Sequence, residues 1–86
     1  MATTARRDLQ PVAWTLGDRI AKVRHLMGLE QDEFAALFGK TQSAVAKWEA
    51  DKTLPKDVVT FAQQLEELAA ERGIAASATW VLGLKG

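Results

Sequence analysis

Residues 31–49 read QDEFAALFGKTQSAVAKWE, two short stretches of helical patterning on either side of one glycine. Helical spacing turns the following apolar side chains inward: Phe34, Leu37 and Phe38 in the first stretch, and Val45 and Trp48 in the second. Gly39 ends the first stretch, because so tight a turn needs a positive φ, which favours glycine. The sequence therefore predicts one helix over residues 31–38 and another that ends near residue 50.

The corner between these two helices has a steric requirement of its own. Helices that cross so closely need a small residue at the contact, and Ala35 meets that need. Thr41 is placed to cap the second helix, whose amino end then presents small polar side chains away from Trp48. These features are typical of a helix-turn-helix motif, whose second helix can lie in the major groove of DNA.

Helical spacing continues on the amino-terminal side of the motif. We expect a helix that begins between Pro11 and Thr15, with Thr15 as its N-cap and Asp18 as the acidic residue of a capping box. Gly28 can end this helix in a left-handed conformation. Residues 1–13 are interpreted as a flexible, basic amino-terminal arm.

Two further helices are expected on the carboxyl side. Pro55 suits the first turn of a fourth helix that ends at Gly73, and Ser77 can cap a short last helix. No stretch alternates apolar and polar residues for long enough to predict a strand. The predicted fold is all-α, a compact domain of four to five helices. Its expected ranges are 14–86 for the single domain, about 31–50 for the helix-turn-helix, and 77–86 for a carboxyl-terminal helix or dimerisation segment.

The composition is that of a small folded protein. Eighty-six residues, 48% of them hydrophobic, suffice for one compact core. The absence of cysteine removes disulfides and thiol catalysis, and it fits a reducing cytosol. We recognise no signal peptide and no transmembrane segment, and therefore expect a cytoplasmic protein of the bacterial cytosol or nucleoid with no membrane association.

The net charge is zero, with 11 basic and 11 acidic residues. Taken alone, this balance argues against a nucleic-acid partner, since phosphate contacts need a positive surface. The charges are unevenly distributed, however: basic residues predominate in segments 1–25 and 39–56, and acidic residues in segment 57–71. A basic front and an acidic back can coexist on a neutral molecule.

The segment from Arg19 to Pro55 resembles the Cro/C1-type helix-turn-helix family, the lambda-repressor-like or XRE-type fold. The matching pieces are RIAKVRHLMGLEQDEFA, LFGKTQSAVAKWE and the proline that follows them, with SATWVLG as a weaker echo of a fifth helix. Three features depart from the usual pattern: Glu30 replaces a serine or threonine, Asp51 replaces a glycine, and segment 55–73 is more than a turn longer.

The resemblance implies functional roles around the second helix of the motif. The base-reading residues would be Thr41, Gln42, Ser43, Ala46 and Lys47. Contacts to DNA phosphates would come from Gln31, Lys40, Lys52 and Lys56, and Arg6 and Arg7 would follow a groove as a basic arm. Arg24 and Glu49 would form a structural salt bridge that fixes the angle of the reading helix. We favour Gln42 most, because its amide can pair with N6 and N7 of adenine. Without the motif, these residues would instead be a solvated helix face, lysines that serve solubility, and a tail without a DNA contact.

The remaining candidates concern self-association and chemistry. The candidates for a dimer interface are Trp80, Val81, Leu82 and Leu84; the alternative for the tryptophans, Trp14 included, is packing at the core or its edge. The only histidine, His25, lacks the partners of a metal site. No serine stands at a spacing that suggests a nucleophile. We therefore predict no metal, no cofactor and no enzymatic activity.

These observations predict a sequence-specific regulator of transcription whose partner is double-stranded DNA. We expect a small phage or bacterial repressor or Cro-like protein that binds an inverted-repeat operator as a homodimer. The alternative is a protein-interaction module or an antitoxin, which would use the same fold and present the acidic fourth helix to a protein partner.

Overall fold

The computed structural model describes residues 14–84. The predicted arm, residues 1–13, and the arm contacts Arg6 and Arg7 lie outside the described residues. Within the described range the chain forms helices and no strand, so the predicted all-α fold is confirmed. The helices are α1 (Leu16–Leu26), α2 (Gln31–Leu37), α3 (Gln42–Glu49), α4 (Val58–Ala70) and α5 (Ala78–Val81).

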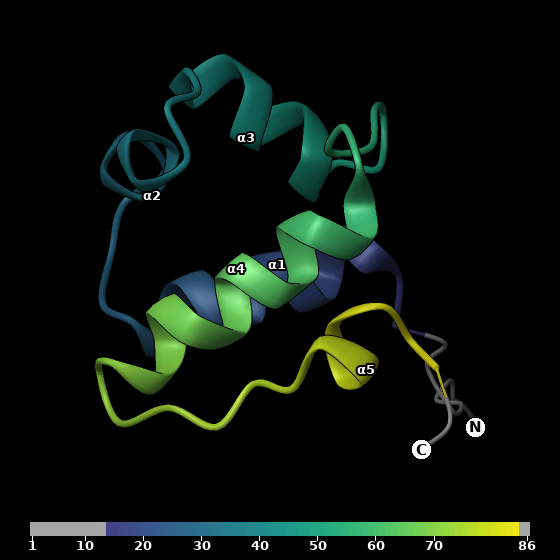
Figure 1. Ribbon diagram of the computed structural model, residues 1–86. Coiled ribbons are helices and arrows are strands. Elements are labelled where there is room, and N and C mark those ends of the chain that lie inside the picture. Colours follow the sequence, from purple (N-terminus) through teal and green to yellow (C-terminus); the bar gives the residue numbers. More distant parts are fainter. Residues whose placement is uncertain (1–13, 85–86) are drawn as a thin grey trace, which may run out of the picture.

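The helices are arranged so that α3 lies at the outside of the molecule. It packs on α2 and on α1, while the short α5 packs on α4 and α1 (Figure 1). In Figure 1, α2 and α3 stand above α4, and α5 lies below it. One long side of α3 is therefore left without a covering helix. Between residues 14 and 84, every helix is too short or too polar to traverse a lipid bilayer.

Local side-chain chemistry accounts for the helix ends. Thr15 and Asp18 form the predicted capping box, in which each side chain accepts a hydrogen bond from the backbone N–H of the other at 3.0 Å. Thr41 Oγ1 accepts from the backbone N–H of Ala44 at 3.1 Å and so caps α3. Gly39 has a φ of 64°, which gives the turn between α2 and α3 its predicted left-handed residue.

A single core joins the helices. Its buried residues are Ile20, Val23, Met27, Phe34, Ala35, Val45, Trp48, Phe61, Ala62, Leu65, Ala69, Ala76 and Val81. Phe61 of α4 contacts the ring of Phe38, the C-cap of α2, and the ring of Trp48 in α3, at centroid distances of 4.8 Å and 5.1 Å. Ala35 is fully buried at the crossing, as predicted. The core thus fixes the angle between α2 and α3 from behind.

Three expectations from the sequence are wrong. Leu37 is 37% exposed and does not face inward, because Phe34 and Phe38 already fill the space toward α4 and Leu37 lies at the rim of a shallow groove beside Leu68. Pro55 is buried in the loop before α4 and not in its first turn, since Asp57 provides the N-cap and the helix begins at Val58.

The third wrong expectation concerns Val81, which is fully buried. It faces α1 and α4 as a core residue, so it cannot contribute to a dimer interface on the surface. The side chains of a one-turn helix point in different directions, so the apolar residues of α5 cannot all lie on the surface.

Candidate nucleic-acid interface

The outward side of α3 carries the residues predicted to read bases. Thr41, Gln42, Ser43 and Lys47 are exposed and Ala46 is half-buried, whereas Val45 and Trp48 on the opposite side lie in the core. Within the described part of the chain, no other helix masks this side of α3. The amino end of α3 is therefore free to enter a groove.

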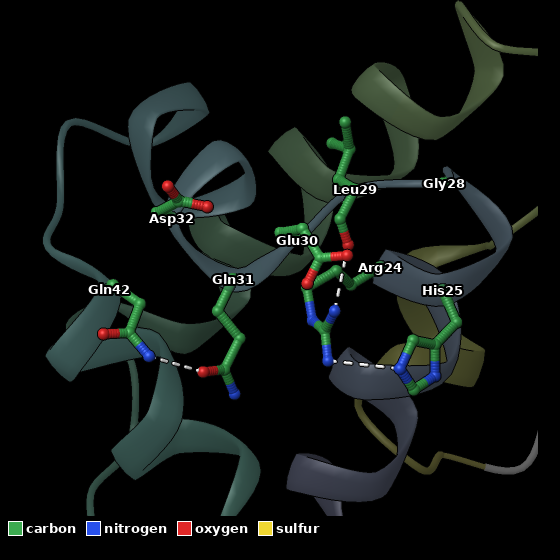
Figure 2. A pocket seen from close by; sticks show the side chains of 8 residues that line it. All are labelled: Arg24, His25, Gly28, Leu29, Glu30, Gln31, Asp32 and Gln42. Atoms are coloured by element: carbon green, nitrogen blue, oxygen red, sulfur yellow. Dashed lines mark hydrogen bonds between the residues drawn. The ribbon is translucent and has the colours of Figure 1, made fainter.

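Gln42 is held by a hydrogen bond across the motif. Its Nε2 donates to Oε1 of Gln31 at 2.7 Å, and Figure 2 shows the two amides pointing toward one another. Gln31 Nε2 in turn donates to Oε1 of Glu49 at 3.0 Å. A chain of side chains thus joins the first residue of α3 to the last residue of the same helix through α2.

This chain continues into α1 through an ion pair. Arg24 Nε donates to Glu49 Oε2 at 2.7 Å, and Arg24 Nη2 donates to Glu49 Oε1 at 3.0 Å. The Arg24 side chain also donates to the backbone carbonyl of Leu29 at 2.9 Å, and the residue is only 8% exposed. The hydrogen bond and charge of Glu49 raise the pKa of Arg24 above its ordinary value, although burial acts in the opposite direction. The pair predicted from the sequence is present in the structure.

A shallow polar groove runs along this network. It is lined by Arg24, His25, Gly28, Leu29, Glu30, Gln31, Asp32 and Gln42 (Figure 2). His25 is exposed, but its Nε2 lies 3.2 Å from Nη2 of Arg24, a contact that the sequence did not suggest. Gln42 is one of the residues that line the groove, so the groove reaches the amino end of α3.

The predicted phosphate contacts flank α3 on both sides. Lys40 precedes α3, Lys52 follows it, and Lys56 precedes α4; all three are exposed. Lys52 lies in the loop three residues after the end of α3, where its backbone N–H donates to the carbonyl of Lys47 at 2.9 Å. These positions allow ammonium groups to meet a DNA backbone on either side of an inserted α3.

The segment that contains α2 and α3 is similar to a known protein family. Residues 20–59 match the family described as Helix-turn-helix. The match supports the predicted resemblance of this part of the chain to the Cro/C1-type helix-turn-helix family. No match was found among curated proteins or among solved structures. The family match supports a DNA-binding helix-turn-helix regulator, and the family's domain is not an enzyme.

In this helix-turn-helix domain the amino end of α2 differs from a simple phosphate site. The Gln31 side chain, predicted to contact phosphate, is engaged on both sides by Glu49 and Gln42. Its neighbours Glu30 and Asp32 are exposed carboxylates, which stabilise the positive helix end but repel phosphate. In the free protein, the Gln31 side chain is positioned to orient Gln42.

One structural residue of the helix-turn-helix domain escaped the sequence reasoning. Gly17 is buried in α1 against the end of α3, and a Cβ at this position would lie 2.6 Å from the carbonyl oxygens of both Trp48 and Glu49. Its backbone N–H donates to Asp51 Oδ1 at 3.0 Å. A glycine inside a helical pattern was the available signal, since such a residue often marks a close backbone approach.

Proposed function

We propose that the chain is a sequence-specific regulator of transcription of the small repressor or Cro-like type, phage or bacterial, that binds double-stranded DNA by placing α3 in the major groove. The observation that carries this proposal is the Gln42 amide, exposed at the amino end of α3 and oriented by Gln31 at 2.7 Å. Recognition helices of this motif contact base edges with the same end.

The hydrogen-bonding capacity of Gln42 fits adenine. An amide nitrogen has two hydrogens, and the Gln42 Nε2 uses one of them on Gln31. The second can donate to N7 of adenine while Oε1 accepts from N6, which is the two-point contact that distinguishes adenine in the major groove. Because Gln31 fixes the amide beforehand, less side-chain entropy is lost on binding.

A homodimer would double the number of base contacts. Trp14, Trp80 and Leu84 are 43%, 39% and 59% exposed, and the two indole rings lie 6.1 Å apart between centroids. Leu82 is half-buried and packs in part against the core. This apolar surface is our candidate for contact with a second copy, which would place two α3 helices on half-sites roughly 10 base pairs apart.

The proposal is tested by selecting bound fragments from random duplex DNA with the purified chain. We expect an inverted repeat, whose symmetry reports a dimer. The affinity for the selected duplex should fall steeply with salt, with a log–log slope near −0.9 for each phosphate neutralised. Equal binding to all sequences would contradict sequence-specific regulation, and a flat salt response would contradict DNA as the partner.

Gln42→Ala is expected to relax base choice at one position in each half-site. The variant loses the two-point contact, at a cost of about 1–3 kcal/mol per half-site, while the phosphate contacts remain. The selection is repeated with the variant and the two motifs are compared. Gln63→Ala makes the same truncation at an exposed position of α4, outside the candidate interface, and serves as the control. An unchanged motif with Gln42→Ala would show that Gln42 does not read a base.

One observation favours a protein partner as a second function. A shallow groove between α2 and α4 is lined by the exposed Leu37 and by Leu68, with the carboxylates of Glu67 and Glu71 beside them. An apolar strip with acidic flanks suits a basic, apolar protein surface. The antitoxin alternative would use this groove and leave α3 free for DNA.

A further inference from the structure

The carboxyl end of α3 closes in a Schellman motif. The backbone N–H of Asp51 donates to the carbonyl of Trp48 at 3.0 Å, and that of Lys52 donates to the carbonyl of Lys47 at 2.9 Å. The left-handed position of this motif usually holds glycine, but here it holds Asp51, with a φ of 59°. An L-residue in this conformation is strained, so its side chain must be considered for a compensating contact.

That contact joins α3 to α1. Asp51 Oδ1 accepts the backbone N–H of Gly17 at 3.0 Å. Gly17 is in the first turn of α1, where backbone N–H groups have no partner within the helix and where a negative charge is favourable. Glycine at position 51 would remove the strain and could not make this bond.

Together with the ion pair, this bond attaches the end of α3 to α1 at two points. Glu49 binds Arg24, and Asp51 binds Gly17. The two α1 residues are seven positions apart, which is about 10 Å along a helix. A helix attached at one point can pivot about it, whereas two separated attachments restrict that rotation.

We propose that Asp51 is a positioning residue that sets the angle of α3 against α1, and thereby the alignment of Gln42 and Lys47 with the bases. This inference rests on the proposed function of α3 as the reading helix. Asp51 also fixes the position of Lys52 relative to α3, because Lys52 is the next residue and its backbone N–H belongs to the same Schellman motif.

The expected effect of Asp51→Gly on sequence-specific binding is opposite in direction to the effect of the charge change alone. Asp51→Gly removes a negative charge beside the expected DNA backbone, which by itself would strengthen binding to any sequence. It also suits the left-handed backbone, so a residue that only terminates the helix would be replaced without loss. Loss of the Gly17 bond, in contrast, should loosen α3 and weaken only the base contacts.

The test compares binding of each variant to the duplex selected by the wild-type chain and to an unrelated duplex. For Asp51→Gly we expect the ratio of the two affinities to fall roughly 10-fold, the size of one mismatched base pair, with affinity for the unrelated duplex unchanged or higher. Asp51→Asn keeps an acceptor oxygen and tolerates the backbone, so its ratio should stay close to that of the wild type. Circular dichroism at the assay temperature establishes that each variant is folded.

Asp57→Gly is the matched control. Asp57 is also left-handed, with a φ of 50°, but its carboxylate accepts from Thr60 in α4 and does not join α3 to α1. Its replacement makes the same change in charge and should leave the affinity ratio unchanged. Amide hydrogen exchange supplies a readout without DNA: the Gly17 amide should exchange faster in Asp51→Gly than in the wild type.

Two results would overturn the role of Asp51. One is an Asp51→Gly protein whose affinity ratio equals that of the wild type; the other is unchanged exchange at the Gly17 amide. If the wild-type chain selects no sequence at all, the proposed function itself fails, and with it the base-aligning role. Faster Gly17 exchange in that case would show that the contact exists and that the error lies in the assigned function.

Discussion

Gly17→Ala is expected to destabilise the domain by about 2–3 kcal/mol, although alanine is the better helix former by about 1 kcal/mol. The added Cβ would lie 2.6 Å from the Trp48 and Glu49 carbonyl oxygens and 2.9 Å from Asp51 Oδ1. Two of these contacts are with backbone, so no side chain can turn away and α3 must shift from α1. The shift also weakens the hydrogen bond from the Gly17 N–H to Asp51.

The measurement is thermal and urea unfolding followed by circular dichroism. For a domain of this size the melting temperature should fall by roughly 4–8 °C for each kcal/mol. Gly28→Ala is the control, because Gly28 has a φ of +73° and nothing within 4 Å of the added Cβ. The stability of that variant should fall by only about 1–2 kcal/mol, the cost of alanine in a left-handed conformation. A Gly17→Ala protein at least as stable as the wild type would contradict the close approach of α1 and α3.

The parts of the fold that could be predicted from the sequence are those set by neighbouring residues. Thr15 and Asp18 identify the start of α1 because a capping box acts within one helical turn. Gly39 identifies the turn because the turn requires a positive φ at this one residue, which glycine adopts readily. Val45 and Trp48 identify the buried side of α3 because helical periodicity alone brings them together.

The errors came from positions decided by distant packing. Leu37 has the spacing of an inward residue, but Phe61 of α4 takes the space beside Phe38, and nothing local to α2 indicates this. In the sequence, Val81 and its neighbour Trp80 belong to the same apolar run. Only the packing of α5 on α4 determines that Val81 is buried and Trp80 is exposed. Tertiary contacts therefore override local spacing at the edges of the core.

In the candidate interface, too, the sequence predicts the individual residues but not the contacts that depend on packing. The family resemblance suggested Gln31 and Gln42 separately, from their places at the starts of α2 and α3. That the two amides bond to each other, and that Gln31 is bound to Glu49, depends on the crossing angle of the helices. The unusual Asp51 was visible in the sequence as a departure, but its partner Gly17 stands 34 positions away.

Glu49→Ala is expected to destabilise the folded domain by about 3 kcal/mol and to weaken sequence-specific DNA binding, although Glu49 lies at the far end of α3 from Gln42. The substitution leaves the Arg24 side chain, which is 10% exposed, without its carboxylate, and breaking a buried pair costs about 3–5 kcal/mol at full burial. It also removes the acceptor for Gln31 Nε2, which frees Gln31 and so loosens Gln42. Urea unfolding measures the first effect; the affinity ratio between selected and unrelated duplex measures the second.

A matched variant and a double variant separate these two effects. Glu67→Ala makes the same change in charge on the exposed side of α4 and should alter neither stability nor the affinity ratio appreciably. Arg24→Met combined with Glu49→Leu replaces the ion pair by apolar side chains, which often restores stability. Gln31 still lacks its acceptor in that protein, so base choice should remain relaxed while the melting temperature recovers. Wild-type selectivity in the folded double variant would show that the chain of contacts from Arg24 to Gln42 stabilises the domain without directing its choice of bases.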